Sequence, residues 1–216
     1  MQKRIFALLM AAAMTMSFAA CGSTEKPAET PSTPAAPSAP AAEYKTEVNV
    51  AITANPPSLD VQATNSNIVG GIGSHIYEPL FAMNQENVPT PVLAESYEVS
   101  EDGTVYTIKI RQGIKFHNGQ EMTADDVVPS MENWLVKSSK ATPIAGTTFA
   151  KVDDYTITAT LPEAYSGALD IMAGNVQFAA IYPKSALDAA GEAGITDFIG
   201  TGPYKLAEWK QDQYIH

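Results

Sequence analysis

The sequence predicts an α/β fold from about Tyr44 onwards, on the strength of three observations. Short runs rich in β-branched and aromatic residues are separated by segments with helical spacing. An Asp-Gly pair lies between two of these runs, where a hairpin turn needs a residue with positive φ. A threonine followed three positions later by an aspartate precedes one helical segment, as in a capping box. The alternation of the two patterns indicates strands and helices in one folded unit.

The first 20 residues have the layout of a secretory signal peptide. Lys3 and Arg4 give a basic start, and an uncharged, mostly apolar run follows at residues 5–18. That run of about 14 residues is too short to span a bilayer, which takes about 20. The only cysteine, Cys21, comes directly after Ala20, an arrangement that resembles the lipobox of bacterial lipoproteins. We therefore expect Cys21 to be lipidated; an ordinary signal peptide with a chance cysteine is the alternative.

A proline-rich segment, residues 21–43, separates this start from the folded part. Five of the 15 prolines of the chain lie in it, among Ala, Ser and Thr. Such a composition cannot bury enough apolar surface to fold. We interpret the segment as the acylated cysteine followed by a tether, which reaches roughly 70 Å at about 3.1 Å per residue.

The charge balance narrows the possible partners. The chain has 13 basic and 24 acidic residues, and loss of the signal peptide leaves a net charge of −13, because it removes two basic residues and no acidic one. Binding to nucleic acid or to anionic lipid depends on Lys and Arg. We therefore expect no nucleic-acid partner, and attachment to a membrane only through the lipid on Cys21. Independently of the charge, we expect a monomeric protein.

The first elements of the folded part are a strand, a helix and a hairpin. Alternating apolar residues predict a strand over residues 48–52. Residues 68–81 predict a weak helix, since three glycines interrupt it. Residues 97–110 predict a β-hairpin whose turn contains Asp102-Gly103.

A second helix is predicted to begin at Thr123. Asp126 is placed to complete a capping box with Thr123. Pro129 lacks a backbone donor and clashes with the preceding turn, so we expect a kink or a shifted start. One face of this helix carries the apolar residues Val127, Met131, Trp134 and Leu135, which we assign to the core.

The remaining elements are shorter. Residues 155–161 and 178–182 predict strands, and residues 184–190 predict a helix that Gly191 ends. The chain finishes at residues 213–216 within a predicted hairpin.

The sequence contains no recognisable catalytic signature. A nucleophile elbow, a zinc-protease helix motif, a phosphate-binding loop and a paired-cysteine motif are all missing. The histidines, His75, His117 and His216, are scattered, and we expect them to pack or to face solvent rather than to bind a metal. The sequence therefore predicts a protein that is not an enzyme and that has no cofactor and no metal site.

A series of short motifs occurs in a fixed order along the folded part. It comprises Pro57-Ser58-Leu59-Asp60, residues 76–81, residues 91–100, Asp102-Gly103 with residues 106–111, residues 113–119, residues 122–128 and residues 200–206. This order resembles the N-terminal half of the family 5 extracellular solute-binding proteins, which serve peptide, dipeptide and nickel ABC importers. Val61, Pro79 and Pro129 depart from the usual pattern. Because members of that family are much longer, the resemblance also implies that this chain is an N-terminal fragment.

The resemblance implies a fold and a domain layout. The fold would be periplasmic-binding-protein-like (type II) and two-lobed, with only the N-terminal part present. Residues 44–216 would be that part of the solute-binding domain, with residues 46–77 and 196–216 in the first lobe and residues 78–195 as an inserted subdomain. Hinge closure would then bury the ligand between the lobes.

The resemblance also implies where a ligand would lie. The segment Thr64-Asn65-Ser66-Asn67 matches a cleft segment of the family, and its amides and hydroxyls can donate to and accept from peptide groups. Capping of the following helix is the alternative. Gln177, in residues 174–177, is a further candidate from the subdomain. We expect residues 200–204 to shape a turn rather than to touch the ligand.

The function implied is that of the substrate-binding component of an ABC importer. It would capture oligopeptides or dipeptides outside the cell and deliver them to the permease subunits in the membrane. A receptor of the same fold for a nickel chelate, a sugar or another solute is the alternative, and a surface hydrolase is a less favoured one. We expect the protein to be lipid-anchored on the outer face of the cell membrane, in the periplasm or cell-wall space.

Overall fold

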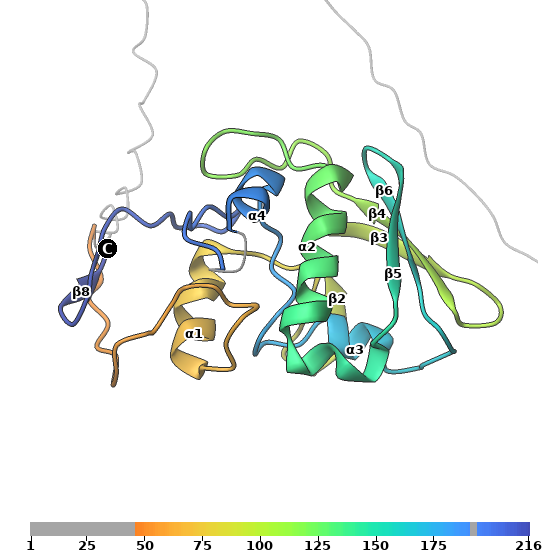
Figure 1. The fold of residues 1–216 in the computed structure, drawn as a ribbon, viewed down its shortest axis with the longest axis horizontal. Coiled ribbons are helices and arrows are strands. Elements are labelled where there is room, and N and C mark those ends of the chain that lie inside the picture. Colours follow the sequence, from red (N-terminus) through yellow and green to blue (C-terminus); the bar gives the residue numbers. More distant parts are fainter. Residues whose placement is uncertain (1–45, 191–193) are drawn as a thin grey trace, which may run out of the picture. The chain divides into compact units, whose positions relative to one another are not determined.

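The computed structural model describes residues 46–190 and 194–216 (Figure 1). The predictions for the signal peptide, for Cys21, for the tether and for Gly191 as a helix end lie outside the described residues. Within the described part of the chain, no helix combines the length and the apolar character needed to cross a bilayer.

A four-stranded antiparallel sheet forms the larger layer, with the strand order β3-β4-β6-β5. Its strands are β3 (Ala94–Val99), β4 (Val105–Ile110), β5 (Thr148–Asp153) and β6 (Thr156–Thr160). Ile108 in the centre pairs with Tyr97 on one side and Ile157 on the other. The predicted hairpin of residues 97–110 is confirmed, since β3 and β4 pair across a turn in which Gly103 has a φ of 72°.

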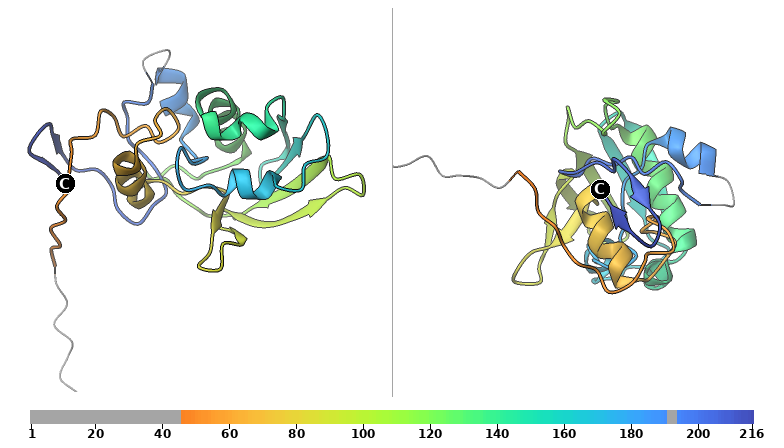
Figure 2. Two further views of the ribbon diagram at one scale, coloured as in Figure 1. Left: turned by 90° about the horizontal axis from the view of Figure 1, so that it is seen from below. Right: turned by 90° about the vertical axis from the view of Figure 1, so that its left-hand side faces the viewer.

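Helix α2 (Ala124–Lys137) packs on one face of this sheet. Figure 2 shows α2 and α3 (Ala168–Met172) on the same side of the strands. Val127, Met131 and Trp134 of α2 are fully buried in the larger hydrophobic cluster, which confirms them as core residues.

The beginning of α2 is as the sequence predicts. Thr123 is the N-cap, and its side chain and that of Asp126 form the reciprocal capping box. Of the two consequences expected of Pro129, a kink or a shifted start, the shift does not occur, because α2 begins at Ala124 and Pro129 lies inside it. A kink stays a prediction. Asp125, also in the first turn, pairs with Lys151 of β5 at 2.9 Å and so connects the helix to the sheet.

Two predicted strands are wrong. Residues 48–52 form no strand, and Val50 is 79% exposed. A strand is stable only when a neighbour takes its backbone hydrogen bonds, and no described strand pairs with this segment. Residues 178–182 are buried but form only an isolated bridge between Pro79 and Ala180. There, side chains take much of the backbone bonding: the amide of Gln62 donates to the carbonyl of Ala180, and the hydroxyl of Ser130 accepts from the N–H of Tyr182.

A second hydrophobic cluster lies around helix α1 (Asn67–Ile76), which confirms most of the predicted helix of residues 68–81. The cluster buries Leu59, Val69 and Tyr182, and α4 (Lys184–Ala190) packs into it through Ala186. The remaining elements are β1 (Phe81–Met83), β2 (Pro89–Pro91), the 3-10 helix η1 (Ser139–Ile144) and the terminal hairpin of β7 (Trp209–Lys210) and β8 (Tyr214–Ile215). The hairpin predicted at residues 213–216 is thus present.

The segment of residues 200–204 packs directly against the end of α1. The N–H of Gly202 donates to the carbonyl of Ile76 at 2.9 Å, and the N–H of Tyr204 donates to the carbonyl of His75 at 3.0 Å. A Cβ on Gly202 would lie 2.6 Å from that His75 oxygen, so only glycine allows the approach. The chain bends at residues 201–203, and the close packing against α1 fits the structural role expected of this segment. That the segment avoids the ligand stays a prediction.

Candidate functional site

A hollow of about 300 Å³ lies beside α1, and we call it the α1 hollow. One wall is the exposed side of α1, and the other is the loop that precedes residues 178–182. The residues that line it are Asn67, Gly70, Gly71, Ser74, Asn175 and Val176. Where a Cβ of Gly70 would stand, the carbonyl oxygen of Asn175 is 3.5 Å away, so the two walls approach closely at this point.

Unpaired side-chain amides face solvent at both walls of the α1 hollow. Asn67 and Asn175 are exposed. Neither side-chain amide has a hydrogen-bond partner among residues 46–190 and 194–216. An amide both donates and accepts, so each of the two can form hydrogen bonds with a peptide group. Gly71, where an added Cβ would meet nothing within 4 Å, leaves part of the helix surface low, which lets a bound chain come near the backbone.

The start of α1 lacks a side-chain cap. Ser66 is the N-cap, but its side chain makes no capping hydrogen bond, and the first turn contains no acidic residue. The alternative that Ser66 caps the helix through its side chain is therefore wrong. Thr64 instead accepts a bond from the N–H of Ser66 at 3.3 Å. The first N–H groups of the helix remain oriented towards its N-terminal end.

The predicted site residues do not all lie in one place. Asn67 lines the α1 hollow, while Thr64 and Ser66 are half-buried and Asn65 is exposed in the loop that leads to the helix. Sequence reasoning missed Gly70 and Ser74. Their spacing of three and seven positions from Asn67 places all three on one helix face, and this signal could have found them.

Gln177 differs from the other predicted site residues because it is buried, with 6% of its surface exposed. Its side-chain oxygen accepts bonds from the N–H and the hydroxyl of Ser139, and its side-chain N–H₂ donates to the carbonyl of Gln62. Contact between Gln177 and a ligand stays a prediction, and its side-chain amide is already paired within the protein.

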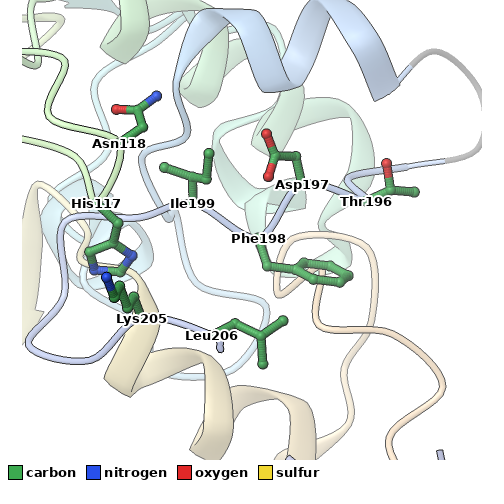
Figure 3. Close-up of a pocket in the computed structure, with 8 residues that line it drawn as sticks. All are labelled: His117, Asn118, Thr196, Asp197, Phe198, Ile199, Lys205 and Leu206. Atoms are coloured by element: carbon green, nitrogen blue, oxygen red, sulfur yellow. The ribbon is translucent and has the colours of Figure 1, made fainter. Parts of the chain in front are cut away.

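A second hollow, of about 320 Å³, lies between the loop that follows β4 and residues 196–206 (Figure 3). His117 fixes one side of it: the N–H of Gly200 donates to Nδ1 of His117 at 3.3 Å, and Nε2 lies 2.8 Å from the carbonyl of Gly202. This pattern fits a ring with its proton on Nε2. His117 is thus a packing histidine, as predicted, and both of its nitrogens are occupied.

A buried carboxylate, that of Asp60, lies among residues of the second hydrophobic cluster. The Asp60 carboxylate is 2% exposed and accepts bonds from the Tyr182 hydroxyl at 3.0 Å and from the N–H of Ile195 at 3.2 Å. Burial raises the pKa of Tyr182 well above its usual value, and the nearby Asp60 charge raises it further. The Tyr182 hydroxyl therefore stays protonated and donates a hydrogen bond to the Asp60 carboxylate across the physiological pH range.

The sequence is similar to a family of known proteins. Residues 88–216 match the family described as bacterial extracellular solute-binding proteins, family 5 middle. The glutathione-binding protein GsiB of Escherichia coli O1:K1 / APEC is 33% identical over 175 residues, which are 78% of this chain and 33% of that protein. The chain thus spans about a third of the length of the curated relatives that it matches.

Solved structures resemble the fold. The binding protein AgaA from A. tumefacien R10, in complex with agropinic acid, superposes with a TM-score of 0.68 and 27% identity, covering 75% of this chain and 33% of that one. The oligopeptide-binding protein AppA from Bacillus subtilis, in complex with a nonapeptide, has a TM-score of 0.65 and 27% identity, covering 75% of this chain and 34% of AppA. The α/β fold is therefore that of the type II periplasmic binding proteins, present in part.

Proposed function

This chain belongs to the family 5 bacterial extracellular solute-binding proteins, and we propose from this premise that it captures oligopeptides or dipeptides outside the cell for an ABC importer. The family consists of substrate-binding components of importers rather than of enzymes. Delivery to permease subunits in the membrane is part of the proposal.

One observation supports a peptide ligand. The two unpaired amides, Asn67 and Asn175, lie on opposite walls of the α1 hollow, which the low surface of Gly71 also lines. A peptide backbone presents one donor and one acceptor per residue, so it can bond to amides on both sides at once. Thr64, Asn65 and Ser66 extend the polar wall towards the end of α1 and are proposed as further contacts.

The proposed domain layout places the polar wall that includes residues 64–67 on one side of a cleft. Residues 46–77 and 196–216 belong to the first lobe, and residues 78–195 form the inserted subdomain. A second lobe closes over the ligand, and the contacts made only in the closed state drive closure.

The alternative ligand is another small solute. The similar protein AgaA was solved with agropinic acid, so a receptor of this fold is not limited to peptides. A nickel chelate is a further possibility, although the described residues contain no group of three or more His, Cys, Asp or Glu side chains placed to hold a metal. A surface hydrolase is the least favoured candidate, because the sequence shows no catalytic signature.

Replacement of either unpaired amide should weaken peptide binding. We expect Asn67→Ala and Asn175→Ala each to lower affinity by roughly two- to tenfold, since each removes about one neutral hydrogen bond. Nuclear magnetic resonance (NMR) titration of the ¹⁵N-labelled chain with glutathione, a nonapeptide and agropinic acid measures this and detects weak complexes. Asn87→Ala, in the turn between β1 and β2, is the control and should leave affinity unchanged. Signal changes at Gly70 and Gly71 with agropinic acid alone would defeat the peptide proposal.

Lipid attachment at Cys21 is also proposed and has its own test. In a bacterium that acylates lipoproteins, we expect labelled palmitate to enter the protein and the protein to remain with the membrane fraction. Cys21→Ser should abolish both, because the cysteine is the only thiol in the chain. A Cys21→Ser protein that still takes up label would contradict the proposal.

A further inference from the structure

The backbone at Gln177 adopts an unusual conformation. Its φ is 47°, in the left-handed region that few non-glycine residues enter. Such a conformation persists only where the surroundings hold it in place, and it is often found at ligand-binding segments. Gln177 directly follows Asn175 and Val176, which form one wall of the α1 hollow.

Four residues from two other segments hold Gln177 in this conformation. Its backbone carbonyl accepts from Nε1 of Trp134 at 2.7 Å and from the hydroxyl of Ser138 at 3.1 Å. Its side-chain oxygen accepts from the hydroxyl of Ser139 at 2.8 Å, and its side-chain N–H₂ lies 3.4 Å from the carbonyl of Gln62. The first three partners lie in α2, at its C-cap and in η1, so they tie the loop to the sheet layer.

Gln62 carries the connection on towards α1. It is completely buried, and its side-chain N–H₂ donates to the carbonyls of Ser130 and Ala180 at 3.1 and 2.8 Å. Its side-chain oxygen accepts from the amide of Asn133 at 2.6 Å. Because Gln62 lies just before the loop that leads into α1, it fixes the start of one wall relative to α2.

We propose that Gln177, together with Gln62, is a positioning residue that sets the separation of the two walls of the α1 hollow and so determines affinity. The effect on affinity rests on the proposed function, whereas the effect on the position of the walls does not. Gln62 fixes the α1 wall, Gln177 fixes the opposite wall, and the two residues are bonded to each other. Gln177 thus acts through Asn175 and Val176, and a ligand does not need to touch it.

The test combines a structural and a binding readout. NMR spectra of the ¹⁵N-labelled chain without ligand report on the amides of Gly70, Gly71, Asn175 and Val176, and titration with glutathione and a nonapeptide gives affinity. We expect Gln177→Ala to shift or broaden these amide signals and to weaken binding by roughly fivefold or more at a temperature where the protein is fully folded. Ser139→Ala, a milder change at an exposed position, should have the same effects to a smaller degree.

Ile157→Val in the sheet is the matched control. Ile157 is fully buried in the larger hydrophobic cluster, whereas α1 packs in the second one, so this variant should lower the melting temperature without moving the amide signals or the affinity. If the role of Gln177 is purely structural, Gln177→Ala will behave like this control, with a lower melting temperature but unchanged amide signals and affinity. That result would overturn the proposal.

The other combinations of amide signals and affinity test the positioning role and its effect on binding separately. Unchanged hollow signals in both Gln177→Ala and Ser139→Ala would refute the positioning role whether or not a ligand binds. Changed signals with unchanged affinity would refute its effect on binding. A chain that binds neither probe would instead defeat the proposed function, and the ligand-free spectra would still decide whether Gln177 sets the wall.

Discussion

Gly200→Ala should destabilise the protein by about 3 kcal/mol or more, because an added methyl group collides with backbone as well as with a side chain. A Cβ at this position would lie 2.8 Å from the carbonyl carbon of Ile76 and 2.7 Å from Cδ1 of Tyr77. Neither neighbour can withdraw easily, since the N–H of Gly202 donates to the Ile76 carbonyl and Tyr77 is 1% exposed. Urea unfolding followed by circular dichroism measures the loss.

Gly71→Ala is the matched control for this prediction. Gly71 lies in α1 and a Cβ there would meet nothing within 4 Å. Alanine is favoured over glycine in a helix, so we expect a gain of up to about 1 kcal/mol. Equal losses in the two variants would show that the packing of residues 200–204 against α1 is not as described.

Trp134→Ala should cost about 3–5 kcal/mol, the range for removal of a large buried aromatic side chain. Trp134 is 1% exposed and packs in the larger cluster between α2 and the sheet. The substitution also removes the Nε1 donor to the carbonyl of Gln177. Because domains are stable by only about 5–15 kcal/mol, we expect a large fall in the urea midpoint.

Trp134→Phe separates packing from hydrogen bonding. Phenylalanine keeps most of the aromatic contact but has no N–H, and the Gln177 carbonyl would retain only the Ser138 hydroxyl as a donor. We expect a cost of about 1–2 kcal/mol. A loss as large as that of Trp134→Ala would mean that the hydrogen bond, rather than the burial, makes the main contribution.

The elements that could be predicted from the sequence are those set by nearby residues. The turn at Asp102-Gly103 and the capping box of Thr123 and Asp126 depend on contacts within a few positions, and both are present. The absence of a strand at residues 48–52 could not be predicted from nearby residues, because an alternating pattern does not reveal whether a pairing strand is available. The prediction of a strand at residues 178–182 is wrong for another reason. A short apolar run indicates that a segment is buried, but not which groups accept and donate its backbone hydrogen bonds.

The candidate site was predictable only in part. The amides of residues 64–67 mark a polar segment before a helix, and Asn67 does line the α1 hollow. Its position opposite Asn175 could not be predicted, because these two residues are far apart in sequence and the loop that holds Asn175 leads into the left-handed backbone of Gln177. A glutamine carries no sequence signal for that conformation, unlike the glycine at position 103.

The strand order β3-β4-β6-β5 has a consequence for how the chain acquires its structure. β3 and β4 are neighbours in sequence, so they can pair as a hairpin as soon as both have been synthesised. The partner of β4 on its other side, β6, comes only after α2, η1 and β5. Closing so long a loop carries an entropic cost that local contacts do not. The centre of the sheet is therefore completed late, and the early hairpin must remain soluble with one edge open until β6 arrives.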